Sequence, residues 1–162
     1  METLHAPWRI EYILSPKPEL KEGLFARIAQ SSDDEANLVV VRDRTCFALL
    51  NRYPYNGGHL MVVPYEHVDM LQYSSQETLE EMILLVQRSQ IHLQEIYRPA
   101  GFNLGMNLGE SAGAGIAEHI HMHVLPRWPG DTNFMTTVAE TRILPEELET
   151  TWRRMRTVFA EQ

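Results

Sequence analysis

The segment from His119 to Leu125 reads His-Ile-His-Met-His-Val-Leu, and it constrains the fold more than any other stretch of the chain. Side chains of an extended strand point to alternate faces, so this spacing predicts that His119, His121 and His123 share one face. The intervening apolar side chains then face a hydrophobic core: Ile120, Met122 and Val124. The pattern therefore predicts a half-buried strand that carries three imidazoles on one side.

The residues on either side of this segment suit an anion. Residues 107–115 form a loop rich in glycine and alanine, and its glycines let backbone N–H groups approach a ligand closely. Arg127 follows the segment and adds a positive charge. Imidazoles, amides and an arginine together indicate a phosphate site. Two other interpretations remain: the histidines form an incidental polar face of an edge strand, or two of them bind zinc.

Hydrophobic periodicity predicts the remaining elements. The expected strands cover residues 38–41, 45–50, 59–64, 102–108 and 119–125, and a short helix covers residues 21–30. The sequence Ser74-Ser-Gln-Glu77 fits a capping box that begins a long helix, which ends before Pro99. The expected apolar stripe of this helix comprises Leu79, Met82, Ile83, Val86, Leu93 and Tyr97. A last helix is expected at about residues 145–160, with Leu148, Trp152, Met155 and Phe159 as its stripe.

This order of elements predicts an α+β fold. We expect a mainly antiparallel sheet of about five or more strands, one long helix and a C-terminal helix, in a single domain over residues 1–162. The expected core covers about residues 25–135.

The charge and composition narrow the classes of partner. The chain has 14 Lys and Arg against 22 Asp and Glu, a net charge of −8, which disfavours broad nucleic-acid binding. No apolar run approaches the roughly 18–20 residues of a membrane span, and the first residues do not resemble a secretory signal. One cysteine, Cys46, allows no disulfide within the chain. We therefore expect a cytoplasmic protein with no nucleic-acid or membrane partner.

The histidine segment and three further motifs resemble the histidine triad (HIT) family of nucleotide hydrolases and transferases, from about Phe25 to Met135. The further motifs are Phe47-Ala-Leu-Leu-Asn-Arg52, Gly58-His-Leu-Met-Val-Val-Pro64 and Asn107-Leu-Gly-Glu-Ser-Ala-Gly113. The chain is most similar to the fragile-histidine-triad branch. The segment from Pro126 to Phe134 looks like a bacterial and archaeal subset that includes diadenosine tetraphosphate phosphorylases.

The resemblance implies a covalent mechanism. His121 would attack the α-phosphorus of a nucleotide and form a nucleotidyl-histidine, with His119 and His123 on either side of the phosphate. Asn107 would hydrogen-bond phosphate oxygens. Backbone amides in the loop would stabilise the developing charge, and the residues implied are Gly113, Ala114, Gly115 and Ile116.

The resemblance also places nucleoside contacts. Asn51 would bind the ribose, and His59 would lie near the triad. Arg127 and Trp128 are further candidates for nucleotide binding, although Trp128 is equally plausible as a buried anchor. Phe25, Ile28 and Leu38 could line the base pocket or belong to the core. We expect His5 and His92 to be surface residues.

One departure from the family pattern concerns zinc. Many bacterial relatives begin this domain with Cys-x-x-Cys, whereas this chain has Gly23-Leu-Phe-Ala26, and His67 and His119 alone cannot complete a tetrahedral site. We therefore predict no structural zinc and no required cofactor. Mg²⁺ or Mn²⁺ would arrive with the nucleotide.

The resulting hypothesis is a homodimeric enzyme that cleaves the phosphoanhydride of adenine nucleotides or dinucleotides, with phosphate or water as acceptor. Diadenosine tetraphosphate phosphorolysis, of the ATP adenylyltransferase type, is the preferred reaction. The alternatives are a dinucleoside polyphosphate hydrolase, a nucleoside phosphoramidate hydrolase, and a non-enzymatic regulatory protein that binds adenine nucleotides.

Overall fold

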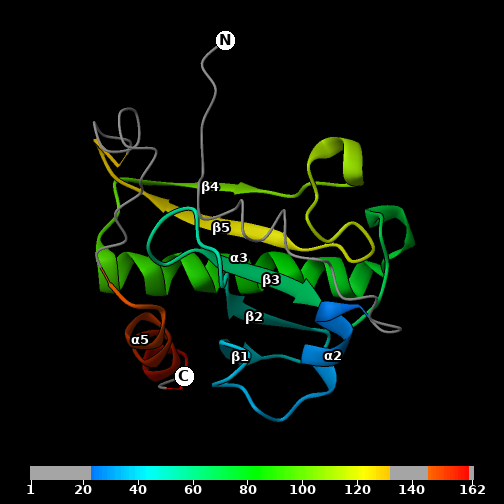
Figure 1. Cartoon of the computed structure of the whole chain (residues 1–162), viewed down its shortest axis with the longest axis horizontal. Helices are drawn as coiled ribbons and strands as arrows, with labels where there is room; N and C mark the ends of the chain where they lie inside the picture. The colour runs from blue at the N-terminus through cyan, green and yellow to red at the C-terminus, as the bar shows by residue number, and fades with distance from the viewer. Residues whose placement is uncertain (1–22, 132–145, 161–162) are drawn as a thin grey trace.

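The computed structural model describes residues 23–131 and 146–160, in which five strands form one antiparallel sheet (Figure 1). The spatial order is β1-β2-β3-β5-β4, and each neighbouring pair is antiparallel. The strands are β1 (Val39–Arg42), β2 (Cys46–Leu50), β3 (Leu60–Pro64), β4 (Gly101–Gly105) and β5 (Met122–Arg127). The helices are α2 (Leu24–Gln30), α3 (Gln76–Tyr97) and α5 (Leu148–Ala160), with short 3-10 turns η1 (Leu71–Tyr73) and η2 (Glu110–Ala112). The α+β prediction is confirmed.

The sheet buries both faces of its central strands. On one face, Cys46, Ala48 and Leu50 of β2 pack with α3 and α5 in the larger hydrophobic cluster. On the opposite face, Phe47 and Leu49 pack with α2 in a smaller cluster. All five residues of β2 and all five of β3 are buried, which explains their unbroken apolar sequences in an antiparallel sheet. The second face is the one that carries the histidines.

The apolar half of the histidine segment confirms the expected alternation. Ile120 and Val124 are buried in the larger cluster, and Met122 packs against it. In register, His123 lies opposite Met61, which belongs to the smaller cluster. The histidine side of the segment therefore faces α2, while the apolar side faces α3.

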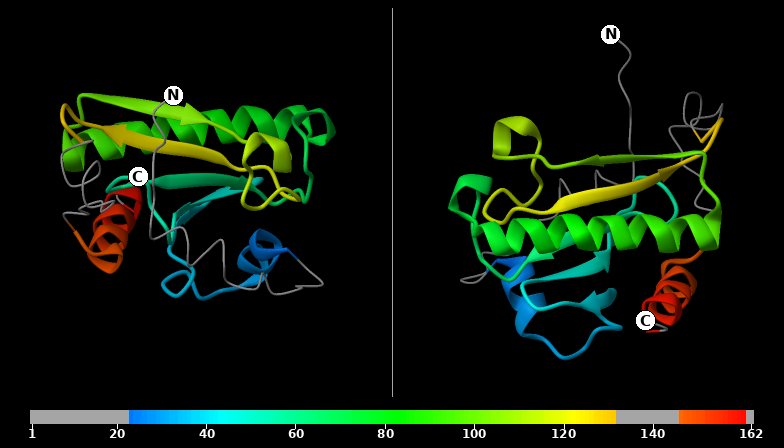
Figure 2. Two further views of the ribbon diagram at one scale, coloured as in Figure 1. Left: turned by 45° about the horizontal axis from the view of Figure 1, so that its top comes forward. Right: turned by 180° about the vertical axis from the view of Figure 1, so that it is seen from behind.

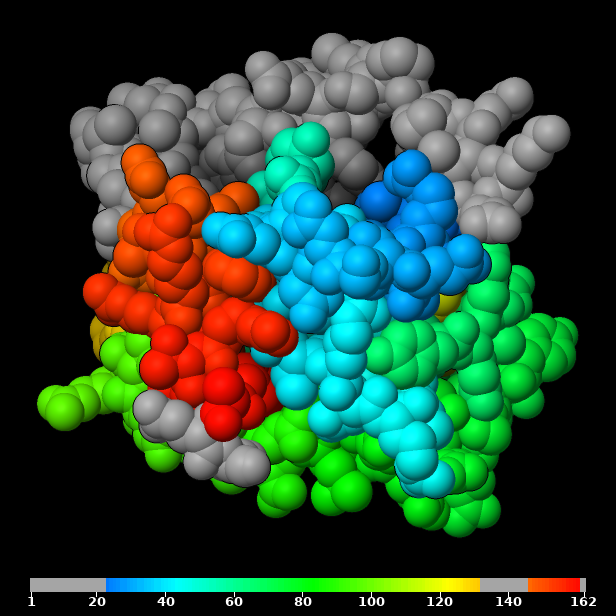
Figure 3. All heavy atoms as spheres, turned by 90° about the horizontal axis from the view of Figure 1, so that it is seen from below, coloured from blue at the N-terminus to red at the C-terminus, as the bar shows by residue number. Residues whose placement is uncertain are grey.

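Helix α5 closes the β1 edge of the molecule. The Trp152 indole N–H donates to the Val39 carbonyl at 2.8 Å, while Met155 and Phe159 enter the larger cluster. Figure 2 shows α5 and α2 at separate places along the sheet. In Figure 3, α5 lies directly against the segment that carries β1.

The expectation of a single strand over residues 119–125 is only partly correct. Strand β5 begins at Met122, so His123 is in the sheet ladder while His119 and His121 precede it. Pairing with β3 ends at Val62 and Met122. Further along β3, Pro64 has no N–H to donate, and its carbonyl accepts instead from the His119 ring at 2.9 Å.

The long helix differs from prediction in three details. The N-cap is Ser75, one residue later than expected, and its hydroxyl accepts from the Thr78 N–H. Ile83 is 54% exposed, so the stripe prediction was wrong there. His92 is only 2% exposed, so its assignment to the surface was wrong as well. His92 lies three residues after buried Ser89, and its ring meets Phe159 of α5 edge-on.

Several expectations fall outside the described residues. They concern His5, the segment from 132 to 145 and the residues before Gly23. Within the described part, no helix combines the length and apolar character that crossing a membrane requires.

Candidate functional site

Three histidine rings, those of His59, His123 and His121, follow one another where β3 pairs with β5. The rings of His121 and His123 lie 5.0 Å apart between centroids, and those of His123 and His59 also lie 5.0 Å apart. Phe25 of α2 is fully buried and contacts His121 and His119, with centroids at 5.1 and 5.6 Å. The structure therefore brings His121 and His123 together with His59, which is far from them in sequence, and connects the His119 ring to His121 through Phe25.

The ring of His121 is held in one tautomer. Its Nδ1 lies 2.9 Å from the His119 carbonyl oxygen, and a carbonyl only accepts, so Nδ1 carries the proton. In the neutral ring, Nε2 then has a free electron pair. Burial lowers the pKa of His121, more than Glu118 and the His119 carbonyl raise it. The ring is therefore neutral at pH 7, with Nε2 as a nucleophile.

His59 and His123 form a second ordered pair. The Tyr55 backbone N–H donates to His59 Nδ1 at 3.1 Å, so the proton of a neutral His59 ring is on Nε2. That nitrogen lies 2.9 Å from His123 Nδ1 and donates to it. The proton of a neutral His123 ring is therefore on its own Nε2. His121 and His123 therefore present different groups: His121 has a lone pair on Nε2, and a neutral His123 has an N–H donor on Nε2.

His119 is oriented away from this chemistry. Its Nε2 donates to the Pro64 carbonyl, while its Nδ1 is buried and has no hydrogen-bond partner within residues 23–131 and 146–160. Burial is the largest influence on its pKa, which is lowered. The principal contribution of His119 is its backbone carbonyl, which fixes the His121 tautomer.

The glycine-rich loop is folded on itself by backbone hydrogen bonds. The Gly113 N–H donates to the Glu110 carbonyl and the Ala114 N–H to the Gly109 carbonyl. Gly109 and Gly113 have φ of 81° and 87°, in the left-handed region that glycine favours. The Asn107 amide lies 3.4 Å from the Gly113 carbonyl, so it braces the loop in this structure. Gly115 and Ile116 follow, and Ile116 packs against the α2-side cluster.

Asn51 lies beside the histidine pair. Its Oδ1 accepts from the Tyr53 N–H at 2.9 Å, and its Nδ2 is 3.4 Å from His59 Nδ1. The predicted ribose residue is therefore adjacent to the site. Of the expected base-pocket residues, Phe25 and Ile28 lie in the α2-side cluster, whereas Leu38 packs on the α3 side.

Arg127 and Trp128 lie at the other end of β5. Arg127 donates to Asp131 through Nε and Nη2, and Nη1 donates to Asn103. Trp128 donates from its indole to the Tyr97 carbonyl and meets the Tyr97 ring edge-on. Arg127 is six positions after His121, which corresponds to about 20 Å of extended chain. Neither residue joins the histidine group.

The residues present do not fit a structural zinc. The His67 and His119 rings are stacked at 4.9 Å, only 19° from parallel, so their in-plane lone pairs do not converge on one ion. The stretch from Gly23 to Ala26 offers no thiolate. In the part of the chain that the structure describes, no group of three or more His, Cys, Asp or Glu could hold a metal.

Two residues that order the site could not be predicted from the sequence. Tyr55 supplies the N–H that sets the His59 tautomer, and its ring stacks on His59 at 4.8 Å. Arg42 binds α2, as described below. Neither has a local signal, because a loop tyrosine and a strand arginine are common and their partners are distant in sequence.

Comparisons with known proteins agree with this geometry. The HIT domain model matches residues 33–130. The chain is 40% identical over 169 aligned residues to the AP-4-A phosphorylase of Mycobacterium tuberculosis, covering 100% of this chain and 86% of that one. It is 27% identical over 93 residues to the asymmetrical bis(5'-nucleosyl)-tetraphosphatase of Schizosaccharomyces pombe, over 57% of this chain and 50% of that one.

A solved structure extends the likeness to the fold. A zinc-bound histidine triad family protein from Mycobacterium smegmatis is similar with a TM-score of 0.70 and 28% identity, over 86% of this chain and 94% of that one. The family model covers more than half of the chain, and the mycobacterial relative, 40% identical, matches 100% of this chain and 86% of its own length. The chain therefore belongs to the HIT family.

Proposed function

We propose that the protein cleaves diadenosine tetraphosphate by phosphorolysis, with a nucleotidyl-His121 intermediate. The reaction class is supported by the mycobacterial relative, a phosphorylase that matches this chain over its whole length. The chemistry is supported by the histidine geometry.

The hydrogen bond from His121 Nδ1 to the His119 carbonyl carries the proposal. It leaves Nε2 with a lone pair, and burial keeps the ring neutral near pH 7. Nε2 attacks the α-phosphorus of one adenylyl group, forming the nitrogen–phosphorus bond. The bond from that phosphorus to the bridging oxygen breaks, and ATP departs.

His123 is proposed to assist the leaving group. Its Nε2–H follows from the bond that His59 donates to its Nδ1, so it acts as a donor toward negatively charged oxygen. Asn51, adjacent to His59, is proposed to hold the ribose. Asn107 and the loop amides from Gly113 to Ile116 are proposed to contact phosphate oxygens, with Asn107, Gly113 and Ala114 exchanging their bonds within the loop for bonds to the substrate.

Inorganic phosphate is the proposed acceptor in the second step. A phosphate oxygen attacks the phosphorus of adenylyl-His121, the nitrogen–phosphorus bond breaks, and ADP leaves with a neutral His121 restored. Water in the same place would release AMP. We propose that Mg²⁺ or Mn²⁺ enters with the tetraphosphate rather than through a protein cage. We also propose that the enzyme works in the cytoplasm, where its buried free Cys46 stays reduced.

Product analysis tests the proposal. The protein is mixed with diadenosine tetraphosphate and Mg²⁺, with and without inorganic phosphate, and the nucleotides are separated chromatographically. We expect ATP plus ADP only when phosphate is present. ATP plus AMP under both conditions would replace the proposal with the hydrolase alternative. Binding without turnover would favour a regulatory nucleotide-binding protein, and His121→Ala is the matched control for contaminating activity.

A further inference from the structure

We propose that Arg42 is a positioning residue for catalysis, which holds helix α2 and, through Phe25, the ring of His121. The inference rests on the proposed function for its kinetic test. Arg42 belongs to β1, at the edge of the sheet, and within the described part of the chain it hydrogen-bonds Asp34, α2 and the C-cap of α2 rather than the histidines.

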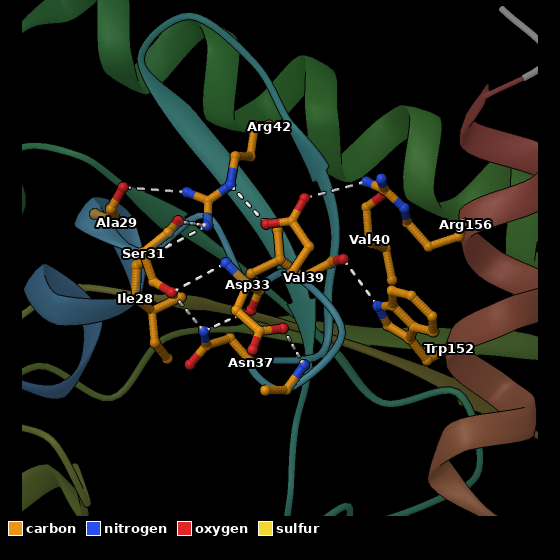
Figure 4. Close-up of polar contacts among 12 residues, drawn as sticks. Ile28, Ala29, Ser31, Asp33, Asn37, Val39, Val40, Arg42, Trp152 and Arg156 are labelled. Carbon is orange, nitrogen blue, oxygen red and sulfur yellow. Dashed lines mark hydrogen bonds and ion pairs between the residues drawn. The ribbon is translucent and has the colours of Figure 1, made fainter.

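The Arg42 guanidinium binds the C-terminal end of α2 (Figure 4). Nη2 donates to the carbonyls of Ile28 and Ser31, both at 2.9 Å, and Nη1 donates to the Ala29 carbonyl at 3.2 Å. Ile28 and Ala29 belong to the last turn of the helix and Ser31 is its C-cap, the region where helix carbonyls lack the regular i+4 partner; the Ile28 carbonyl also accepts the Ser31 N–H at 3.2 Å. One side chain therefore satisfies three carbonyls and ties α2 to the sheet.

Helix α2 depends on such contacts for its position. It has seven residues, and no side chain caps its N-terminus at Gly23. A helix of about two turns is marginal by itself in water, so packing and caps decide where it lies. Its buried side chains are Phe25 and Ile28, which lie on one face because they are three residues apart.

Phe25 connects the helix that Arg42 binds to the histidine rings. The Ile28 carbonyl is bound by Arg42, while Phe25, one turn earlier, touches both His121 and His119. Phe25 is fully buried, so its ring excludes water from that side of His121. A rotation or shift of α2 would move this ring and change the orientation of His121.

Asp34 holds the guanidinium in place. Its carboxylate accepts from Arg42 Nε at 2.8 Å and also faces Arg156 of α5 at 3.4 Å. The Arg42 guanidinium lies 5.6 Å from the Phe47 ring centroid. A planar guanidinium reaches these acceptors in several directions at once, which a lysine ammonium cannot reproduce.

Steady-state kinetics with diadenosine tetraphosphate and phosphate test the role. We expect Arg42→Ala to lower kcat by about ten- to a hundred-fold, because small misplacements of reacting groups cost that much. The KM should stay within about twofold. The kcat of Arg42→Lys should fall between those of the wild type and Arg42→Ala. Arg156→Ala is the matched control, since it removes the outer partner of Asp34 and a bond to the Val40 carbonyl but none of the bonds to α2, and its kcat should be unchanged.

A double-mutant cycle separates positioning from general destabilisation. If Arg42 acts through Phe25, then Arg42→Ala combined with Phe25→Leu lowers kcat by much less than the product of the single effects. Multiplicative effects, or an unchanged kcat in Arg42→Ala, would overturn the proposal. If Arg42→Ala is unfolded at the assay temperature, Arg42→Lys replaces it in the cycle, with the same two outcomes.

A readout that needs no substrate keeps this inference separate from the proposed function. The ring nitrogens of His121 are followed by NMR at pH 7, in wild type and Arg42→Lys. We expect the His121 signals to move and those of His92, on the opposite face of the sheet, to stay. Unmoved His121 signals would overturn the positioning role. Failure of the wild-type protein to turn over the substrate would instead refute the proposed function alone.

Discussion

At the scale of single residues, backbone groups determine what each histidine can do. The His119 carbonyl accepts from His121 Nδ1 and so keeps the proton on that nitrogen, whereas the Tyr55 N–H donates to His59 Nδ1 and so keeps that nitrogen unprotonated. Through His59, the same effect reaches His123. Identical side chains are therefore suited to the different roles proposed for them, a nucleophile and a donor, because the backbone presents a different partner to each.

The pH dependence of catalysis follows from the burial of His121. Protonation removes the Nε2 lone pair, and burial makes the imidazolium unfavourable, so the pKa lies below the ordinary value of 6.5. The nearby ionisable groups are His119, His123 and Glu118, of which Glu118 acts in the opposite direction. As pH falls, kcat/KM should therefore persist through pH 6.5 and decline at lower pH. If kcat/KM already falls to half of its maximum at or above pH 6.5, His121 is not the group whose protonation stops the reaction.

At the scale of elements, the sequence pattern predicted which face of each strand is buried better than where each strand ends. Alternation in 119–125 is a local property, and it placed Ile120 and Val124 in the core correctly. The start of β5 depends on what β3 offers across the sheet, namely Pro64 and its carbonyl. That partner is 55 residues away from His119. Local periodicity contains no information about it.

The same distinction applies to the candidate site: contacts within one segment could be predicted from the sequence, and contacts set by other segments could not. Spacing within one segment brought His121 and His123 together, and a family resemblance added Asn51 and His59. Arg127 lies in the same segment, but its direction is set by Asp131 in the following turn. The surface prediction for His92 rests on the lack of a partner nearby in sequence, whereas its ring partner, Phe159, belongs to the distant helix α5 and covers it on the buried side of α3.

The first turn of α3 supplies a test at this scale. The Ser75 hydroxyl accepts the Thr78 N–H at 3.2 Å, satisfying one of the free amides at the helix N-terminus. Ser75→Ala should lower the free energy of unfolding by about 1 kcal/mol, or the Tm by about 3 °C. Exposed Ser111, outside this helix, is the control, and Ser111→Ala should stay within roughly 0.5 kcal/mol. Equal effects from both substitutions, measured by thermal melts, would contradict the cap.

At the scale of the whole molecule, two exposed features suggest a partner copy. Large apolar side chains on the outer side of α3 remain exposed, namely Ile83, Leu84 and Ile91. Leu84 and Ile91 are seven residues apart and so share one face of the helix. Among the strands of the described residues, β4 lies at the edge and pairs with β5 alone, and its Leu104 is 48% exposed. Unpaired edges and apolar patches are typical of interfaces.

We propose that these surfaces form the interface of a homodimer. A two-fold axis would place the same helix face on both sides, so a single charge introduced there appears twice and repels itself. Leu84→Glu should convert the dimer to a monomer, as measured by size-exclusion chromatography with light scattering. Tyr73→Glu is the matched control, because Tyr73 is 63% exposed but lies on η1, before α3 begins, and not on the helix face that carries Leu84 and Ile91. A monomeric wild type, or a dimer that survives both Leu84→Glu and Ile91→Glu, would rule out this interface. A dimer lost equally in Tyr73→Glu would place the contact on η1 instead.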